Sequence, residues 1–262
     1  MQSEPSLLQG LAIQARVLHA LILRELITRF GRENLGVLWL VAEPLIFTLG
    51  VATLWTATGL HRASNLPIVA FAITGYSSVL MWRNSASHCA GAIEVNKSLL
   101  YHRPVHVLDV LLARSALEIS GATCSFALLT IGFSYFELMD PPNDLMKVVG
   151  GWLMLAWFGA ALGVLVGAGT AFSRIVERLW TPISYLLFPI SGAAYMVDWL
   201  PHKMQEIVLY LPMVHGIELM REGYFGGVVR THYDMGYMAL SCLILSTIGI
   251  YLAREAGRRF EL

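Results

Sequence analysis

Charge is scarce in this sequence. Only 14% of the 262 residues are Asp, Glu, Lys or Arg, whereas soluble globular domains average about 25%. Eighteen basic and eighteen acidic side chains give a formal net charge of zero, so the chain lacks the positive excess that is typical of nucleic-acid-binding proteins. Because 56% of the residues are hydrophobic, the composition predicts a membrane protein that has no nucleic-acid partner.

Cysteine is scarce as well. Cys89, Cys124 and Cys242 have no metal-binding spacing and leave one cysteine over in any pairing, so we expect neither a metal site nor a disulfide framework. None of the three lysines follows a glycine. The sequence therefore lacks a phosphate-binding loop that ends in Gly-Lys-Ser/Thr, and any ATP chemistry has to come from another chain.

Few residues suggest catalysis, and we predict no catalytic residue. His102 and His106 stand four apart, but the glutamate of metalloprotease helices is missing and Pro104 disfavours a continuous helix. The alternative is a membrane-embedded transferase that uses His88, His102 or His106 with a carboxylate such as Asp109. Changing those residues would then abolish the synthesis of its product.

What the sequence does contain is a set of apolar stretches long enough to cross a membrane. Six of them satisfy the length and charge test for spanning helices: 35–60, 63–82, 110–136, 148–173, 179–197 and 236–253. Thirteen basic residues fall on the side that holds both termini and five on the other. This imbalance places both ends of the chain in the cytoplasm.

The first 34 residues predict an amphipathic helix. Their apolar positions recur every three or four residues while the arginines lie off that face, which is typical of a helix in the membrane interface. A helix packed on a protein core has the same pattern and remains an alternative. Charged residues interrupt this segment too often for a cleavable signal peptide.

Two connections are longer than simple turns, whereas 174–178 is expected to be a tight connection. The cytoplasmic loop 83–109 predicts a short amphipathic helix over 93–101. The outer loop 198–235 is apolar enough to dip back into the membrane, which suggests a pore mouth or gate. Within it, Glu218 and Arg221 are three residues apart, so they share a helical face and can pair.

Polar and aromatic residues within the spans are candidates for a transport path. Glu43 lies inside the first span and must face protein or water; it either lines a hydrated path or bonds a neighbouring helix. Aromatic rings in the spans either pack helices or line a weakly charged lumen in which a carbohydrate chain could slide. The candidates are Trp39, Phe47, Trp55, Tyr76, Tyr185, Phe188, Tyr195 and Trp199. In the fourth span, Gly159, Gly163 and Gly167 predict the close approach of another helix.

Three groups of residues carry a family resemblance. Arg24-Glu25, Arg29-Phe30, Leu35-Gly36, Trp39 and Pro44 resemble the opening motif of permease subunits of ABC-2 type polysaccharide exporters. Asn96-Lys97-Ser98-Leu99-Leu100 with Pro104-Val105 and Asp109 resembles the cytoplasmic loop of the same subunits. A third group resembles the capsular-polysaccharide branch of the family: His215, Glu218, Arg221-Glu222-Gly223 and Phe225-Gly226.

The resemblance implies an all-α membrane protein with six transmembrane helices, an N-terminal interface helix and periplasmic re-entrant helices before the last span. It implies one domain over 1–262, made of the interface helix (1–34), spans one to five (35–197), the re-entrant segment (198–235), and span six with the tail (236–262). A homodimer of this kind would work with two ATPase subunits that bind ATP and Mg, in the bacterial inner membrane. It would pass lipid-linked capsular polysaccharide to periplasmic and outer-membrane partners; O-antigen, teichoic acid or another cargo is the alternative.

The resemblance also implies roles for particular residues. The loop between spans two and three would dock on the ATPase through Glu94, Asn96, Lys97, Leu100 and Arg103. The N-terminal helix would lie near the substrate entrance, with Arg24, Arg29 and Phe30 placed to contact acidic lipid or the ATPase. The outer gate would contain His215, Glu218, Arg221 and Glu222, at an interface with the second protomer or a periplasmic adaptor.

Overall fold

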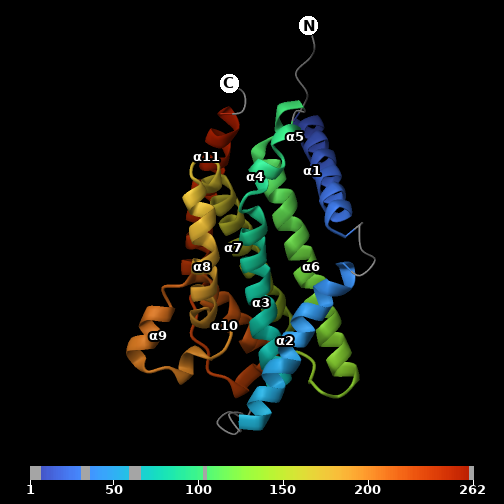
Figure 1. Ribbon diagram of the computed structural model, residues 1–262. Coiled ribbons are helices and arrows are strands. Elements are labelled where there is room, and N and C mark those ends of the chain that lie inside the picture. Colours follow the sequence, from blue (N-terminus) through green and yellow to red (C-terminus); the bar gives the residue numbers. More distant parts are fainter. Residues whose placement is uncertain (1–6, 31–35, 59–65, 103–104, 260–262) are drawn as a thin grey trace.

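The computed structural model describes residues 7–30, 36–58, 66–102 and 105–259, and every regular element within these ranges is helical (Figure 1). The expected all-α class is therefore confirmed. The helices, in chain order, are α1 (Leu7–Phe30), α2 (Gly36–Thr58), α3 (Ile68–Cys89), α4 (Ala92–Val95), α5 (Lys97–His102), α6 (Val107–Tyr135), α7 (Leu145–Thr170), α8 (Arg174–Ile190), η2 (Val197–Trp199), α9 (His202–Val208), α10 (Pro212–Phe225), η3 (Gly226–Val228) and α11 (Met235–Arg258).

Three helices are long and apolar enough to cross a membrane. Within the described residues these are α6, α7 and α11, which correspond to the third, fourth and sixth expected spans. Helices α2, α3 and α8 correspond to the first, second and fifth expected spans, respectively. Helix α8 has only 17 residues, fewer than the about 20 that a full crossing needs.

Two expected boundaries are wrong. Helix α3 continues to Cys89 instead of ending at residue 82, because Ser85, Ala86 and Cys89 keep a buried face at helical spacing. Helix α8 already begins at Arg174, so 174–178 is its first turn and not a connection; the Ser173 hydroxyl caps it by accepting from the Ile175 N–H at 3.2 Å. It ends at Ile190, before Gly192 adopts φ +88°.

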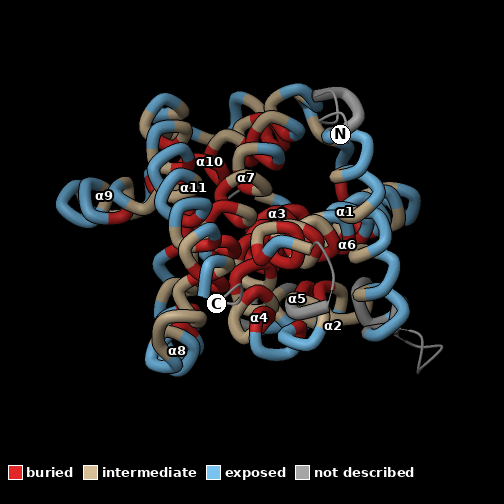
Figure 2. The backbone as a smooth tube through the Cα atoms, turned by 90° about the horizontal axis from the view of Figure 1, so that it is seen from above, coloured by how far each residue is buried: buried red, intermediate tan, exposed pale blue. Residues whose placement is uncertain are grey.

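Helix α7 forms the centre of the bundle and packs against α3, α10 and α11. In the view from above, buried residues follow α3, α7 and α10, while the outer helices are largely exposed (Figure 2). A Cβ at Gly159 would lie 3.0 Å from the Trp82 Cα, and one at Gly163 would lie 2.8 Å from the Ser115 Oγ. The close helix approach predicted from the glycine repeat is therefore confirmed.

Helix α1 packs along α6 (Figure 1). One face of α1 thus packs on protein, as expected for the alternative in which the N-terminal helix packs on a protein core. Elsewhere on α1, Ile13, Leu23 and Ile27 are exposed. The helix consequently presents apolar surface both to α6 and to its surroundings.

Candidate functional site

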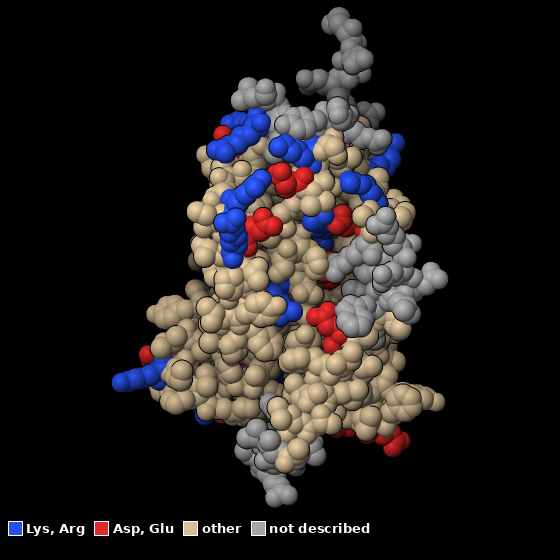
Figure 3. Space-filling model, in the orientation of Figure 1, with Lys and Arg blue, Asp and Glu red and all other residues tan. Residues whose placement is uncertain are grey.

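The candidate residues gather at the two ends of the bundle and on one of its sides. We call the end that carries α4, α5 and the C-terminus of α11 the α4/α5 end, and the end that carries α9 and α10 the α10 end (Figure 1). On the face shown in Figure 3, acidic and basic side chains are concentrated towards the α4/α5 end, above a largely uncharged region. On this face, the two ends therefore differ in surface charge.

At the α4/α5 end, the chain reverses at Gly91, whose φ of +72° favours glycine. Asn96 joins α4 to α5 and is buried: its Oδ1 accepts from Arg24 Nη1 at 2.9 Å, and its Nδ2 donates to the Ala92 carbonyl at 2.9 Å. Glu94 and Lys97, on either side of it, are exposed. The other two expected docking residues are Leu100, which is half-buried, and Arg103, which lies outside the described residues.

Polar contacts tie α1 to this end. Besides the bond from Arg24 to Asn96, Gln14 Nε2 donates to Asp109 Oδ1 on α6, and Glu25 Oε1 lies 3.0 Å from Arg114 Nε. Helix α1 is thereby fixed both to α6 and to the α4–α5 junction. The side chains of Arg29 and Phe30 lie outside the described part of the chain.

A charged hollow of about 370 Å³ lies between α4, α5 and the connection from α7 to α8. Its walls carry charges of both signs, contributed by Glu94, Lys97, Arg174, Glu177 and Arg259. The hollow places the exposed Glu94–Lys97 segment beside the first turn of α8. This arrangement suits a partner that offers complementary charges.

Aromatic side chains from α2, α3 and α8 meet on one side of the bundle. The rings of Phe47 and Tyr76 are stacked with their centroids 3.6 Å apart, and Phe188 is edge-on to both, at 6.0 and 6.2 Å. A small apolar cavity of about 100 Å³ adjoins them. Three of the expected path residues, far apart in the sequence, thus form one cluster.

Two charged residues adjoin this cluster. Glu43 and Arg83 lie close enough to the Tyr76 hydroxyl to act on it electrostatically, and the Arg83 guanidinium is 5.7 Å from the centre of the exposed Tyr185 ring. Sequence reasoning missed Arg83 because it was assigned to the cytoplasmic loop. Its position directly after the buried run that ends at Trp82 is the signal that could have found it.

The remaining expected path residues lie apart from the cluster. The Tyr195 hydroxyl donates to the Ile190 carbonyl at 2.7 Å, and the half-exposed Trp199 stacks on Phe71 with ring centroids 5.3 Å apart. Burial raises the pKa of Tyr195 to about 12. The side chains of Trp39 and Trp55 lie outside the described residues.

At the α10 end, Arg221 is fully buried. Its Nη1 donates to the carbonyls of Gly192 and Tyr195 and its Nη2 to that of Ala193, each at 2.6 Å. The guanidinium also lies 3.9 Å from the centre of the Phe71 ring. Arg221 thus holds the segment that follows α8 against α3 and α10.

Glu218 likewise attaches two other backbone segments to α10. Its Oε1 accepts from the Val197 N–H at 3.2 Å and its Oε2 from the His232 N–H at 3.1 Å. Glu218 and Arg221 share a helical face but do not form an ion pair, because each side chain bonds backbone groups instead. Burial raises the pKa of Glu218 and lowers that of Arg221 to about 10, and their opposite charges counter both shifts.

The other two gate candidates are also engaged within the chain. His215 bonds the Leu209 carbonyl through Nε2 and accepts from the Asp234 N–H through Nδ1, both at 2.8 Å. Glu222 Oε1 accepts from Lys147 Nζ at 2.7 Å. That bond holds the pKa of the Glu222 carboxyl below its usual value. All four gate candidates therefore lie in one region and join α10 to its neighbours.

Of the histidines that a transferase would use, His88 and His106 have structural contacts, and the side chain of His102 lies outside the described residues. Asp109 is buried and accepts from the His106 N–H at 3.0 Å, which closes the N-terminus of α6. His88 Nδ1 lies 3.3 Å from Glu118 Oε1, and Arg114 donates to the His88 carbonyl at 2.8 Å. Among the described residues, no group of three or more His, Cys, Asp or Glu could hold a metal ion.

Comparison with known proteins places the chain in a family. Residues 16–225 match the family model described as ABC-2 type transporter. The chain is 43% identical to the capsule polysaccharide export inner-membrane protein CtrC of Neisseria meningitidis, over 98% of this chain and 97% of that protein. It is 39% identical to the capsule polysaccharide export inner-membrane protein BexB of Haemophilus influenzae (97% and 96%), and 28% identical to the polysialic acid transport protein KpsM of Escherichia coli (94% and 95%).

The family model covers most of the chain, and the first two relatives match it from end to end. The helical bundle with its long apolar helices agrees with that match. The chain belongs to the ABC-2 type transporter family, in the group of the capsule polysaccharide export inner-membrane proteins.

Proposed function

We propose that this chain is the permease subunit of an ATP-driven exporter that carries lipid-linked capsular polysaccharide from the cytoplasm to the periplasm. The observation that carries the proposal is the exposed Glu94–Lys97 segment, which the buried Asn96 holds beside a charged hollow. A transport subunit without its own phosphate-binding loop needs such a surface for its ATPase. The capsule export function of the relatives supports the choice of cargo.

In this proposal the α4/α5 end faces the cytoplasm and the α10 end faces the periplasm. Helices α2, α3, α6, α7, α8 and α11 are the six spans of one domain over 1–262, and both termini are cytoplasmic. The short α8 crosses only part of the bilayer as a helix. Segment 198–235, with the buried α10, forms the outer gate without spanning the membrane.

The ATPase docks at the α4/α5 end through the exposed Glu94 and Lys97 and covers the charged hollow between α5 and α8. ATP and Mg bind to that partner and not to this chain. Asn96 positions the docking segment from inside, through its bond to Arg24. Helix α1 then rests on the inner leaflet with the apolar side chains of Ile13, Leu23 and Ile27.

The polysaccharide passes along the side of the bundle where Phe47, Tyr76 and Phe188 cluster. A second copy of the chain closes this side into a conduit. Aromatic rings can stack on the apolar faces of sugars, and the polar groups of Glu43 and Arg83 beside Tyr76 keep the path hydrated. Export partners in the periplasm and outer membrane then receive the polymer.

A docking test compares two matched pairs of exposed charges. Glu94→Ala/Lys97→Ala removes one acid and one base at the α4/α5 end, and Lys203→Ala/Glu206→Ala removes the same charges from α9 at the α10 end. Co-purification of the ATPase with each full-length variant measures docking. We expect at least about a tenfold loss for the first pair only, because removing interfacial charge contacts costs about 2 kcal/mol or more. Equal retention by both variants would contradict the docking proposal.

The cargo is tested in a strain that lacks this chain. We expect capsular polysaccharide to accumulate inside the cells, and we expect the wild-type chain to restore its export. The accumulated polymer is purified and its sugars are analysed. Accumulation of O-antigen or teichoic acid instead would assign a different cargo to the same permease, and loss of polymer synthesis would favour the transferase.

A further inference from the structure

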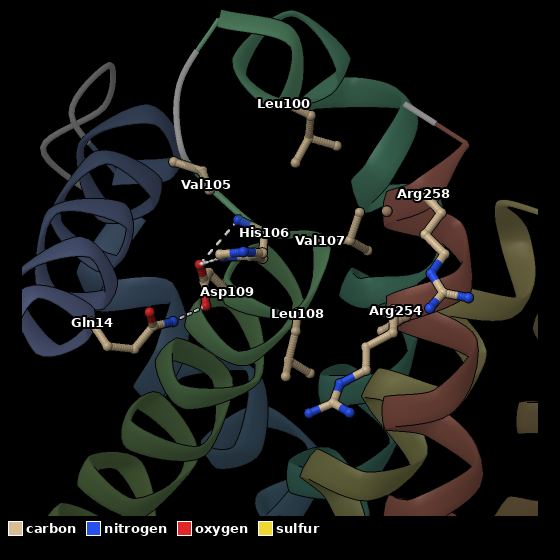
Figure 4. Close-up of a pocket in the computed structure, with 11 residues that line it drawn as sticks. Gln14, Leu100, Val105, His106, Val107, Leu108, Asp109, Arg254 and Arg258 are labelled. Atoms are coloured by element: carbon tan, nitrogen blue, oxygen red, sulfur yellow. Dashed lines mark hydrogen bonds and ion pairs between the residues drawn. The ribbon is translucent and has the colours of Figure 1, made fainter. Parts of the chain in front are cut away.

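The cytoplasmic ends of α1, α6 and α11 enclose a second hollow, of about 460 Å³ (Figure 4). Arg254 and Arg258 lie on its α11 wall, and Gln14, His106 and Asp109 lie on the opposite wall. This hollow is separate from the docking hollow, with which it shares no lining residue. Nothing in the proposed transport cycle uses it.

The two arginines continue an apolar stripe of α11. Leu243, Ile250 and Tyr251 are exposed on the same side of the helix as Arg254 and Arg258. Leu243, Ile250, Arg254 and Arg258 follow one another at seven or four residues, and Tyr251 lies three residues before Arg254. Helix α11 is long and apolar enough to span a membrane. A lipid that lies along this face therefore has its acyl chains beside Leu243 and Ile250 and its headgroup at the level of the arginines.

The charges of the hollow favour an anion on the α11 side. Arg254 has no hydrogen-bond or ion-pair partner among the described residues, and Arg258 has an exposed contact with Glu255 at 3.3 Å. On the other wall, the Asp109 carboxylate is buried and accepts bonds from Gln14 and from the His106 N–H. The Asp109 charge is thus stabilised inside the protein, whereas the guanidinium groups of Arg254 and Arg258 remain available to bind an anion.

We propose that this hollow binds the phosphate of an anionic phospholipid from the inner leaflet. Arg254 and Arg258, one helical turn apart, contact the phosphate together, and guanidinium groups suit phosphate oxygens because they offer paired donors. The bound lipid fills the space between α1 and α11, which are attached to α6 and α7 respectively. The proposal rests on the orientation given above, with this end in the cytoplasm.

The test uses native mass spectrometry of the purified full-length chain with phosphatidylglycerol or phosphatidylcholine at equal concentration. We expect preferential retention of phosphatidylglycerol, weakened by high salt. Arg254→Gln/Arg258→Gln is expected to lower its apparent affinity by about thirtyfold, from the summed contributions of two arginines near an anionic headgroup. Arg174→Gln/Arg178→Gln is the matched control, since it removes two exposed arginines with the same spacing from α8 at the same end.

Three results would overturn the proposal: equal retention of the two lipids by the parent chain, equal losses in both double variants, or displacement of phosphatidylglycerol by inorganic phosphate at similar concentrations. The last result would indicate a site for free anions. Arg254→Lys/Arg258→Lys keeps both charges but loses the paired donors, so its affinity is expected to lie between those of the parent chain and the Gln variant. This result would show that the loss in the Gln variant does not come from misfolding. If a variant does not fold, the parent chain still tests the proposal, through its retention of phosphatidylglycerol over phosphatidylcholine in low and in high salt. Loss of ATPase docking in the Glu94/Lys97 variant leaves this result unaffected.

Discussion

The α10 end and the α4/α5 end use charge in opposite ways. At the α10 end, Arg221 and Glu218 are buried and bond the backbone of neighbouring segments. At the α4/α5 end, Asn96 is buried with Arg24 as its partner, but Glu94 and Lys97 remain exposed. Because a buried charge is tolerated only when it is well bonded, the charges of the first end maintain its own structure, whereas Glu94 and Lys97 at the second end remain at the surface.

Removing Arg221 is the strongest test of this contrast. Arg221→Met leaves the carbonyls of Gly192, Ala193 and Tyr195 without their donor inside the protein, and we expect a loss of about 3–5 kcal/mol in stability. The exposed Arg178→Met should change stability by less than about 0.5 kcal/mol. Thermal unfolding of the purified variants in detergent measures both. Similar melting temperatures for the two variants would show that the α10 end does not depend on its buried arginine.

The same end can be tested from its α3 side. A Cβ at Gly75 would lie 2.2 Å from the Ala193 carbonyl oxygen and 2.8 Å from Arg221 Nη2. We expect Gly75→Ala to destabilise the protein by about 1–3 kcal/mol, because backbone has to move to make room. Gly132→Ala on α6 meets nothing within 4 Å and should be neutral or stabilising by about 0.5–1 kcal/mol. Unfolding midpoints that shift in the same direction would contradict this close approach.

The smallest effect is expected at the α4/α5 end. Arg24→Ala should cost about 0.5–1.5 kcal/mol, as one hydrogen bond to Asn96 is lost at a partly exposed site. Arg16→Ala is the control on the same helix, since among the described residues Arg16 bonds only the carbonyl of Ala12 within α1. A double-mutant cycle with Asn96→Ala measures the coupling. We expect a coupling energy for Arg24 and none for Arg16, together with faster amide hydrogen exchange in α1 of the Arg24 variant; the reverse pattern would place the attachment of α1 elsewhere.

The sequence was sufficient to predict which segments form helices. Runs of apolar residues indicated α6, α7 and α11, and the glycine repeat of α7 indicated the close approach of another helix, though not which one. Helix ends were less predictable, since they depend on individual groups such as the Ser173 hydroxyl and the positive φ of Gly192. The hydropathy of a segment does not reveal such local features.

The partners of the charged residues could not be predicted. Arg114 and Glu118 stand four apart, but Arg114 pairs with Glu25 from α1, and Glu118 lies beside His88. Asn96 was expected to contact an ATPase, yet it is buried and Arg24 reaches it from 72 residues earlier in the chain. Contacts between distant segments decide these pairings, and helical spacing describes only neighbours on the same helix.

Helix α3 joins the two ends as one uninterrupted rod. It passes beside Ala193 and Arg221 at Gly75 and reaches the turn at Gly91 that begins α4. From Gly75 to Cys89 the helix rises by about 21 Å, at about 1.5 Å per residue. In the proposed exporter, this helix would transmit a movement of the docking segment to the α10 end, where α3 packs closely against Ala193 and Arg221.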